Sequence, residues 1–160
     1  MKKGSRGDQG GHCTRAWRDP QRANWAETAP RPLLMEVWYA APATVVACAM
    51  PIGPLGQPLF LAGKAARDAP LVPTPRRFPC VLLSHGTGGS ALQLGWLGTA
   101  RAAQGSLVAL VHHHGNTSVE PYAVQGFCLW WERAQDLRPA LPGLWAYAPH
   151  CAAQQRHREE

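Results

Sequence analysis

Apolar and polar side chains alternate along residues 31–40, RPLLMEVWYA, in the way that a β-strand requires. With a period of two, one face of the strand carries Leu34, Glu36 and Trp38, and the other carries Met35, Val37 and Tyr39. We therefore predict a strand here. The residues before it, 1–30, are polar and glycine-rich, and they predict an irregular N-terminal arm.

A strand, a helix and a second strand are predicted between residues 78 and 112. CVLLS (80–84) and SLVALVH (106–112) are apolar runs of the length of buried strands. Between them, apolar side chains recur at helical spacing at Leu92, Trp96, Ala100 and Ala103. Ser90 with Gln93 forms a capping box at the start, and Gly105 suits the end. This order predicts a right-handed βαβ unit, and hence a mostly parallel sheet with helices on both faces.

The remaining segments give weaker patterns. Prolines and glycines are dense over 51–79, which predicts a wrapping loop or short antiparallel pieces, and GKAARDAP (63–70) allows one helical turn. Residues 126–137 predict a helix with one apolar face and with Trp130 and Trp131 as packing residues. Glu132 and Asp136 lie one turn apart and predict a solvated face. They and Glu120 are candidate acids or bases.

Composition indicates one soluble domain with a core. The 160 residues are 46% apolar and 16% charged, and the net charge is +6. The basic residues are scattered, so a solvated surface is favoured and no nucleic-acid partner is predicted. The basic N-terminus lacks the apolar core of a signal peptide, and ATVVACAM (43–50) is too short to span a membrane. We expect a cytoplasmic protein with no membrane partner.

No cofactor or metal is predicted. The five cysteines are widely spaced and include no C-x-x-C pair, so they predict free, mostly buried thiols, with Cys80 and Cys128 as core residues. His112, His113 and His114 are consecutive and point to alternate faces of a strand, which disfavours a shared metal ion. They border the carboxyl end of a strand, where they either contact a substrate or close a loop.

The segment His85-Gly86-Thr87-Gly88-Gly89 joins the first apolar strand to the helix. Glycine lets the backbone approach a ligand, and amides at such a turn favour negative charge. The P-loop Lys-Ser/Thr and the Gly-x-Gly-x-x-Gly spacing are absent, so an oxyanion hole is a better hypothesis than a phosphate site. A glycine-rich turn with no ligand remains open. His85 either orients the loop through a ring N–H or packs beside it.

Three segments together resemble the N-terminal half of bacterial α/β-hydrolases, most closely the dienelactone-hydrolase and platelet-activating-factor-acetylhydrolase-like enzymes. They are residues 31–40, the Ser-His-Gly-x-Gly-Gly loop at 84–89, and His-His-His-Gly-Asn-Thr at 112–117, where the family usually begins with Asn. The similarity covers roughly residues 17–138. It implies an α/β fold, hydrolysis of carboxylic esters or related acyl bonds, and an oxyanion or substrate-binding role for 85–89, His113 and His114. The amide of Thr87 is the expected donor.

The Gly-x-Ser-x-Gly elbow that carries the nucleophile in that family does not occur in this sequence. We therefore predict no catalytic nucleophile, acid or base, and an incomplete α/β-hydrolase-like sheet whose C-terminal half is absent. The expected organisation is an irregular arm at 1–30, a partial hydrolase domain at 31–138 and a divergent, disordered tail at 139–160. These features predict a truncated, weakly active or inactive esterase.

The alternative is a non-catalytic fragment that pairs with another polypeptide. SLVALVH is expected to have an edge without a partner in the chain, and an apolar edge of that kind favours self-association.

Overall fold

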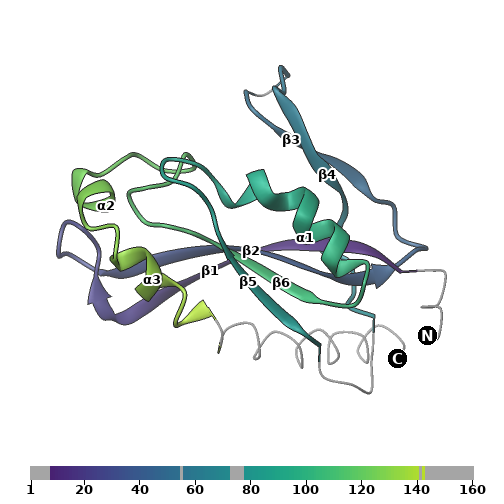
Figure 1. Ribbon diagram of the computed structural model, residues 1–160, viewed down its shortest axis with the longest axis horizontal. Coiled ribbons are helices and arrows are strands. Elements are labelled where there is room, and N and C mark those ends of the chain that lie inside the picture. Colours follow the sequence, from purple (N-terminus) through teal and green to yellow (C-terminus); the bar gives the residue numbers. More distant parts are fainter. Residues whose placement is uncertain (1–7, 55, 73–77, 141, 143–160) are drawn as a thin grey trace.

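The computed structural model describes residues 8–54, 56–72, 78–140 and 142, and its described residues form one six-stranded sheet with three short α-helices (Figure 1). The strand order is β3-β4-β1-β2-β6-β5. The strands are β1 Asp8–Ala23, β2 Pro30–Pro42, β3 Cys48–Ile52, β4 Phe60–Arg67, β5 Cys80–Ser84 and β6 Leu107–His112. The fold is therefore of the mixed α/β kind.

The N-terminal segment belongs to the sheet. β1 pairs with β2 in a long antiparallel hairpin and is also flanked by β4, so the prediction of an irregular arm over 1–30 is wrong from residue 8 onward. The glycines that suggested a loop allow close packing instead. A Cβ atom on Gly10 would lie 2.8 Å from Thr99 Cγ2, and one on Gly11 would lie 2.6 Å from Tyr39 Cε2. Residues 1–7 lie outside the described part.

The β5-α1-β6 unit forms as predicted. β5 and β6 are parallel, and the connection between them contains a 3-10 turn at Ala91–Leu94 and α1 at Gly95–Ala102. Ser90 N–H donates to Gln93 Oε1 at 3.4 Å, and Gly105 has a left-handed φ of 84° after the helix. The sheet as a whole is mixed rather than mostly parallel, because β1–β2, β2–β6 and β3–β4 are antiparallel.

One edge of the sheet is β5, and the other is β3. β6 is paired with β2 on one side and with β5 on the other, so the expectation that SLVALVH lacks a partner is wrong. Among the described residues, β5 has a neighbouring strand on one side only. Its end residues, Cys80 and Ser84, are exposed and the three between them are half-buried.

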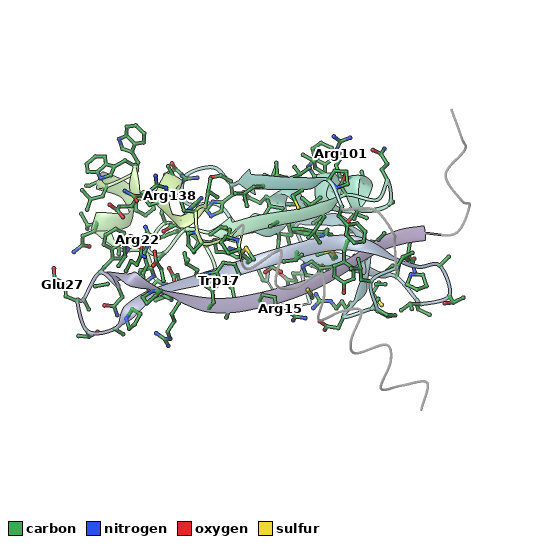
Figure 2. All side chains as sticks on the ribbon, turned by 90° about the horizontal axis from the view of Figure 1, so that it is seen from below. Arg15, Trp17, Arg22, Glu27, Arg101 and Arg138 are labelled. Atoms are coloured by element: carbon green, nitrogen blue, oxygen red, sulfur yellow. The ribbon has the colours of Figure 1, made fainter. Side chains whose placement is uncertain are left out.

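The two faces of β2 follow the predicted alternation. Met35, Val37 and Tyr39 belong to one buried cluster and Trp38 to the other. α1 covers the Trp38 face, and Arg101 on α1 lies on the opposite side of the sheet from Arg15 and Trp17 (Figure 2). Among the described residues, no helix of similar length covers the second face, so helices on both faces are not confirmed.

The buried face of α1 is made of small residues. Gly95, Gly98 and Ala102 are buried, whereas Trp96 of the predicted apolar stripe is 59% exposed. The reason is Trp38, whose ring lies so close to α1 that a Cβ atom on Gly98 would be 2.6 Å from Trp38 Cδ2. The presence of the helix was predicted correctly, but the face that it buries was not.

The segment from 51 to 79 contains antiparallel pieces, as one of the two hypotheses predicted. β3 and β4 form a hairpin that projects from the main sheet (Figure 1). The helical turn predicted within 63–70 is wrong, because Gly63 to Arg67 continue β4. No helix of the described residues is long and apolar enough to cross a membrane.

The helix predicted over 126–137 is broken into two. α2 spans Val124–Cys128 and α3 spans Glu132–Asp136, and both lie at the end of the sheet where β5 and β6 finish (Figure 1). Trp130 and Trp131 lie in the break between the two helices and are 69% and 50% exposed, so they are not packing residues. Most of the predicted tail, 141 and 143–160, lies outside the described residues.

Cys48, Cys80 and Cys128 are free thiols, as predicted, but the prediction that the cysteines are mostly buried is wrong for these three. Cys13 is buried, whereas Cys48, Cys80 and Cys128 are exposed. Cys80 is exposed because it begins the edge strand β5. Cys151 lies outside the described residues.

Candidate active site

The loop at 85–89 is held by the loop that follows β6. Gly88 N–H donates to Asn116 Oδ1 at 2.6 Å, and Asn116 Nδ2 donates to Gly126 O at 2.8 Å. Thr117 Oγ1 donates to Gly89 O at 3.1 Å. The two loops follow parallel neighbouring strands, so the carboxyl ends of β5 and β6 place them side by side. The glycine loop is therefore fixed before any ligand arrives.

The three glycines of the loop have different structural reasons. Gly88 has a left-handed φ of 66°, which favours glycine. A Cβ atom on Gly89 would lie 2.5 Å from Gln93 Oε1, where the capping interaction at the start of the helix is made. Gly86 has neither constraint, because nothing lies within 4 Å of the place where its Cβ atom would be. The space over Gly86 is open.

The backbone amides of residues 86–89 divide into two pairs. Those of Gly88 and Gly89 already donate within the protein, to Asn116 Oδ1 and to Gly86 O. Within the described ranges, the amides of Gly86 and Thr87 donate no hydrogen bond to another group of the protein. Two of the four donors are thus available to a ligand, and Thr87 is one of them.

His85 has a defined tautomer. Burial lowers the pKa of His85 to about 4, so the ring is neutral at neutral pH. Its Nε2 accepts from the backbone N–H of His113 at 3.3 Å, so the proton lies on Nδ1, which donates to Gly86 O at 2.7 Å. The geometry agrees with the interpretation in which a ring N–H of His85 orients the loop.

The three consecutive histidines bind three different acids. His112 Nε2 lies 3.2 Å from Glu36 Oε1, and His114 Nδ1 lies 2.9 Å from Glu120 Oε1. His113 faces Asp136, as described below. Among the described residues, no three His, Cys, Asp or Glu side chains are grouped so that they could hold a metal ion.

His112 is one part of a buried polar cluster between β1, β2 and β6. Glu36 also accepts hydrogen bonds from His12 Nε2 and from Thr14 Oγ1, each at 2.8 Å. Burial raises the pKa of Glu36, but the hydrogen bonds from His112, His12 and Thr14 outweigh it and lower the pKa to about 2. The cluster joins three strands behind the candidate site.

A continuous hydrogen-bonded chain links Ser84, His113 and Asp136. Ser84 Oγ lies 2.8 Å from His113 Nε2, and His113 Nδ1 lies 3.0 Å from Asp136 Oδ2. The three residues come from the end of β5, the residue after β6 and the end of α3. Asp136 has no exposed surface, so the prediction that it lies on a solvated face is wrong.

The burial of the Asp136 carboxylate is compensated by two arginines, Arg31 and Arg22. Arg31 Nε donates to Asp136 Oδ1 at 2.7 Å, and Arg22 NH2 lies 2.9 Å from the same oxygen. Arg22 also reaches Glu132 at 3.1 Å, and Figure 2 shows Arg22 at the end of the sheet occupied by α3. Burial raises the pKa of Asp136, but the hydrogen bonds from His113 and Arg31 more than offset this, and the pKa lies below its ordinary value.

A cavity of about 470 Å³ opens beside Ser84. It is lined by Ser84, Thr87, Trp130, Trp131, Arg133, Ala134 and Leu137. Arg133 donates to Ser84 Oγ at 3.2 Å, to Thr87 Oγ1 at 3.4 Å and to His85 O. A hydroxyl, a cation, two indole rings and Thr87, whose amide has no acceptor among the described residues, therefore meet at one cavity.

The structure brings most of the predicted site residues together and separates one of them. Thr87 of the loop lines the cavity with Ser84, and His113 contacts Ser84 and His85 behind it. His114 instead lines a second cavity of about 270 Å³ with Trp17, Leu34 and Glu120. Its ring stacks on that of Trp25, with 5.9 Å between the ring centroids. His114 thus belongs to a different side of the loop.

Comparison with known proteins gives one match at the level of structure. The chain is similar to a ferulic acid esterase. That enzyme, from Streptomyces cinnamoneus, superposes with a TM-score of 0.65 and 26% sequence identity over 82% of this chain. The described chain spans 45% of the length of that esterase. No family profile matches the chain, and no curated protein matches it.

Sequence reasoning missed Ser84 and Arg133, and it named Asp136 only as one of three candidate acids or bases. Ser84 was compared only with the Gly-x-Ser-x-Gly pattern, which it does not fit. The available signal was its position at the end of an apolar strand, directly before the glycine loop, because side chains at that edge of a parallel pair meet. The contacts to residues 133 and 136 have no local signal, since they depend on where the broken helix docks.

Proposed function

We propose that this chain acts on carboxylic esters, with the loop at 85–89 binding the carbonyl oxygen of the substrate. The observation that carries the proposal is the pair of available amides at Gly86 and Thr87, in a loop that Asn116 already holds in place. Donors that are fixed beforehand stabilise a developing oxyanion without a cost of reorganisation. The similarity to the ferulic acid esterase supports the same class of reaction.

The cavity favours an acyl group with an aromatic part. Trp130 and Trp131 line it, and both are largely exposed, so their ring surfaces are available to a planar substrate. Arg133 adds a cation near Thr87 that favours negative charge in the same place. We expect slow turnover, because the Gly-x-Ser-x-Gly elbow of the resembling family is absent from the sequence.

The test is hydrolysis of p-nitrophenyl acetate and of a p-nitrophenyl cinnamate by the full chain. Gly86→Val fills the open space over the loop, and we expect kcat/KM to fall on the order of tenfold or more, because the substrate oxygen loses its place beside the amides. Ala100→Val adds two methyl groups at an exposed position of α1 and should leave the rate unchanged. Equal rates for the wild type, both variants and buffer would refute the proposal.

A second candidate function is pairing with another polypeptide, and the specific observation that favours it is the edge strand β5. Its outer side has no neighbouring strand among the described residues, and its three central residues are apolar and half-buried. An apolar edge is a template for strand addition by a second copy or another chain. In this alternative the glycine loop has only a structural role.

A further inference from the structure

The hydroxyl of Ser84 is placed where a nucleophile of acyl transfer would need to be. Its Oγ atom is 2.8 Å from His113 Nε2, and the other ring nitrogen of His113 is 3.0 Å from Asp136. This order of serine, histidine and acid, each within hydrogen-bonding distance of the next, is the geometry by which nucleophilic serines are recognised on unrelated folds.

The protonation states follow from the surroundings of each group. Asp136 is ionised, because hydrogen bonds from His113 and Arg31 hold its pKa below the ordinary value. An ionised carboxylate only accepts hydrogen bonds, so His113 Nδ1 carries the proton. Burial lowers the pKa of His113, against the opposing effect of Asp136, so the ring is neutral at neutral pH. His113 Nε2 is therefore left to accept the proton of Ser84.

The hydroxyl is also accessible. Ser84 is exposed and lines the cavity of about 470 Å³ together with Thr87, whose amide is available. Arg133 NH2 lies 3.2 Å from Ser84 Oγ and Arg133 NH1 lies 3.4 Å from Thr87 Oγ1, so a cation stands beside both the hydroxyl and the glycine loop. His113 and Asp136 are fully buried behind it, which keeps the general base in one orientation.

A purely structural role does not explain the whole chain of bonds. Asp136 with Arg31 and Arg22 holds α3 against the sheet through buried contacts, and this needs neither the hydroxyl nor its exposure. Ser84 adds an exposed group at the open end of the network, on the cavity side.

We propose that Ser84 is the acyl-accepting nucleophile of this chain, with His113 as its general base and Asp136 as the residue that positions His113. This inference rests on the proposed ester hydrolysis and names the group that performs it. It replaces the missing serine elbow with a residue that ends β5.

The proposed reaction has two balanced steps. Ser84 Oγ attacks the ester carbonyl carbon as its proton passes to His113 Nε2. The carbon–oxygen bond to the alcohol then breaks, and the alcohol leaves with that proton. A water molecule attacks the acyl-Ser84 carbonyl, gives a proton to His113 and releases the carboxylic acid, and the proton returns to Ser84 Oγ.

The test is covalent labelling of the full chain with a fluorophosphonate, followed by peptide mass mapping and by ester hydrolysis on the same samples. We expect label on Ser84 in the wild type and none in Ser84→Ala. His113→Gln should slow labelling at least tenfold. Ser118→Ala removes another exposed hydroxyl close to the glycine loop and should label as the wild type does. Thermal unfolding shows which variants are folded.

The outcomes separate this inference from the proposed function. Ester hydrolysis that Gly86→Val reduces, with no label on Ser84 and full activity in Ser84→Ala, would overturn the role of Ser84 and leave the oxyanion loop standing. Label on Ser84 without turnover of either ester would support the reactive serine and count against the proposed function. A folded wild-type chain with neither label nor turnover would overturn both.

Discussion

Asp136 Oδ2 lies 3.0 Å from His113 Nδ1, and both side chains are completely buried. Asp136 follows the last strand of the sheet by 24 residues in the sequence, yet it closes a network that reaches back to β1 and β2 through Arg22 and Arg31. This contact explains how a short helix at the end of the sheet is tied to the candidate site. Because these groups are buried, removing the Asp136 carboxylate should lower the stability of the folded protein.

Replacing Asp136 by Asn should destabilise the protein strongly. The change leaves Arg31, which is 2% exposed, without its carboxylate, and removing one partner of a buried ion pair costs about 3–5 kcal/mol. Glu132→Gln is the matched control, because Glu132 is partly exposed and its carboxylate pairs with Arg22, which is also partly exposed, so the loss of its charge should cost less than about 1 kcal/mol. Urea unfolding measures both. Similar losses for the two variants would contradict the importance of burial.

Acid should weaken the fold through Glu36. Its pKa is about 2 in the folded protein and near 4.5 when unfolded, so the stabilisation is complete above pH 4.5 and is lost as the pH falls toward 2. The shift in the pKa of Glu36 corresponds to about 3 kcal/mol of unfolding free energy. The groups that face Glu36 are His12, His112 and Thr14. Glu36→Gln should show a flatter dependence of unfolding free energy on pH in this range, and an unchanged slope would contradict the assignment.

Gly98→Ala should destabilise the helix–sheet contact by about 1–3 kcal/mol, because the added methyl group would overlap the Trp38 ring at 2.6 Å. Gly86→Ala is a matched change with nothing within 4 Å of the new atom, and it should alter the unfolding free energy by less than about 0.5 kcal/mol. Thermal unfolding of the two variants tests this difference. A stabilised Gly98→Ala protein would show that α1 can move away from Trp38.

The edge strand predicts self-association that a charge should reduce. Cys80→Lys places a cation at the exposed start of β5, and lysine on an edge opposes pairing. Light scattering under reducing conditions should show a smaller assembly for this variant than for the wild type. Cys80→Ser removes the thiol without adding charge and should assemble like the wild type. A monomeric wild type with a cooperative unfolding transition would contradict the edge interpretation.

The sequence predicted best where the signal was local and repeated. The alternation in β2, the apolar runs of β5 and β6 and the capping residues Ser90 and Gln93 all describe what the structure shows. The prediction failed at glycines, because a glycine can indicate either a loop or a strand position where a neighbouring side chain packs closely. Gly10 and Gly11 suggested a loop, but they lie in a strand against which Thr99 and Tyr39 pack closely.

Only part of the candidate site could be predicted, again because only its local motif is visible in the sequence. The glycine loop is a contiguous motif, so residues 85–89 could be named from the sequence. His114 was grouped with them, but the chain turns after β6, so that His113 faces Asp136 whereas His114 faces Glu120. Asp136 was placed on a surface because helical spacing does not reveal the two arginines from β1 and β2 that bury it.

Binding of a tetrahedral anion to the glycine loop tests the central claim most directly. In an ¹H–¹⁵N spectrum of the full chain titrated with phenylphosphonate, the amide signals of Gly86 and Thr87 should move, because these donors have no acceptor among the described residues. The amides of Gly88 and Gly89 already donate to Asn116 and Gly86, so their signals should move much less. Unmoved Gly86 and Thr87 signals at saturating phenylphosphonate would contradict an oxyanion-binding loop.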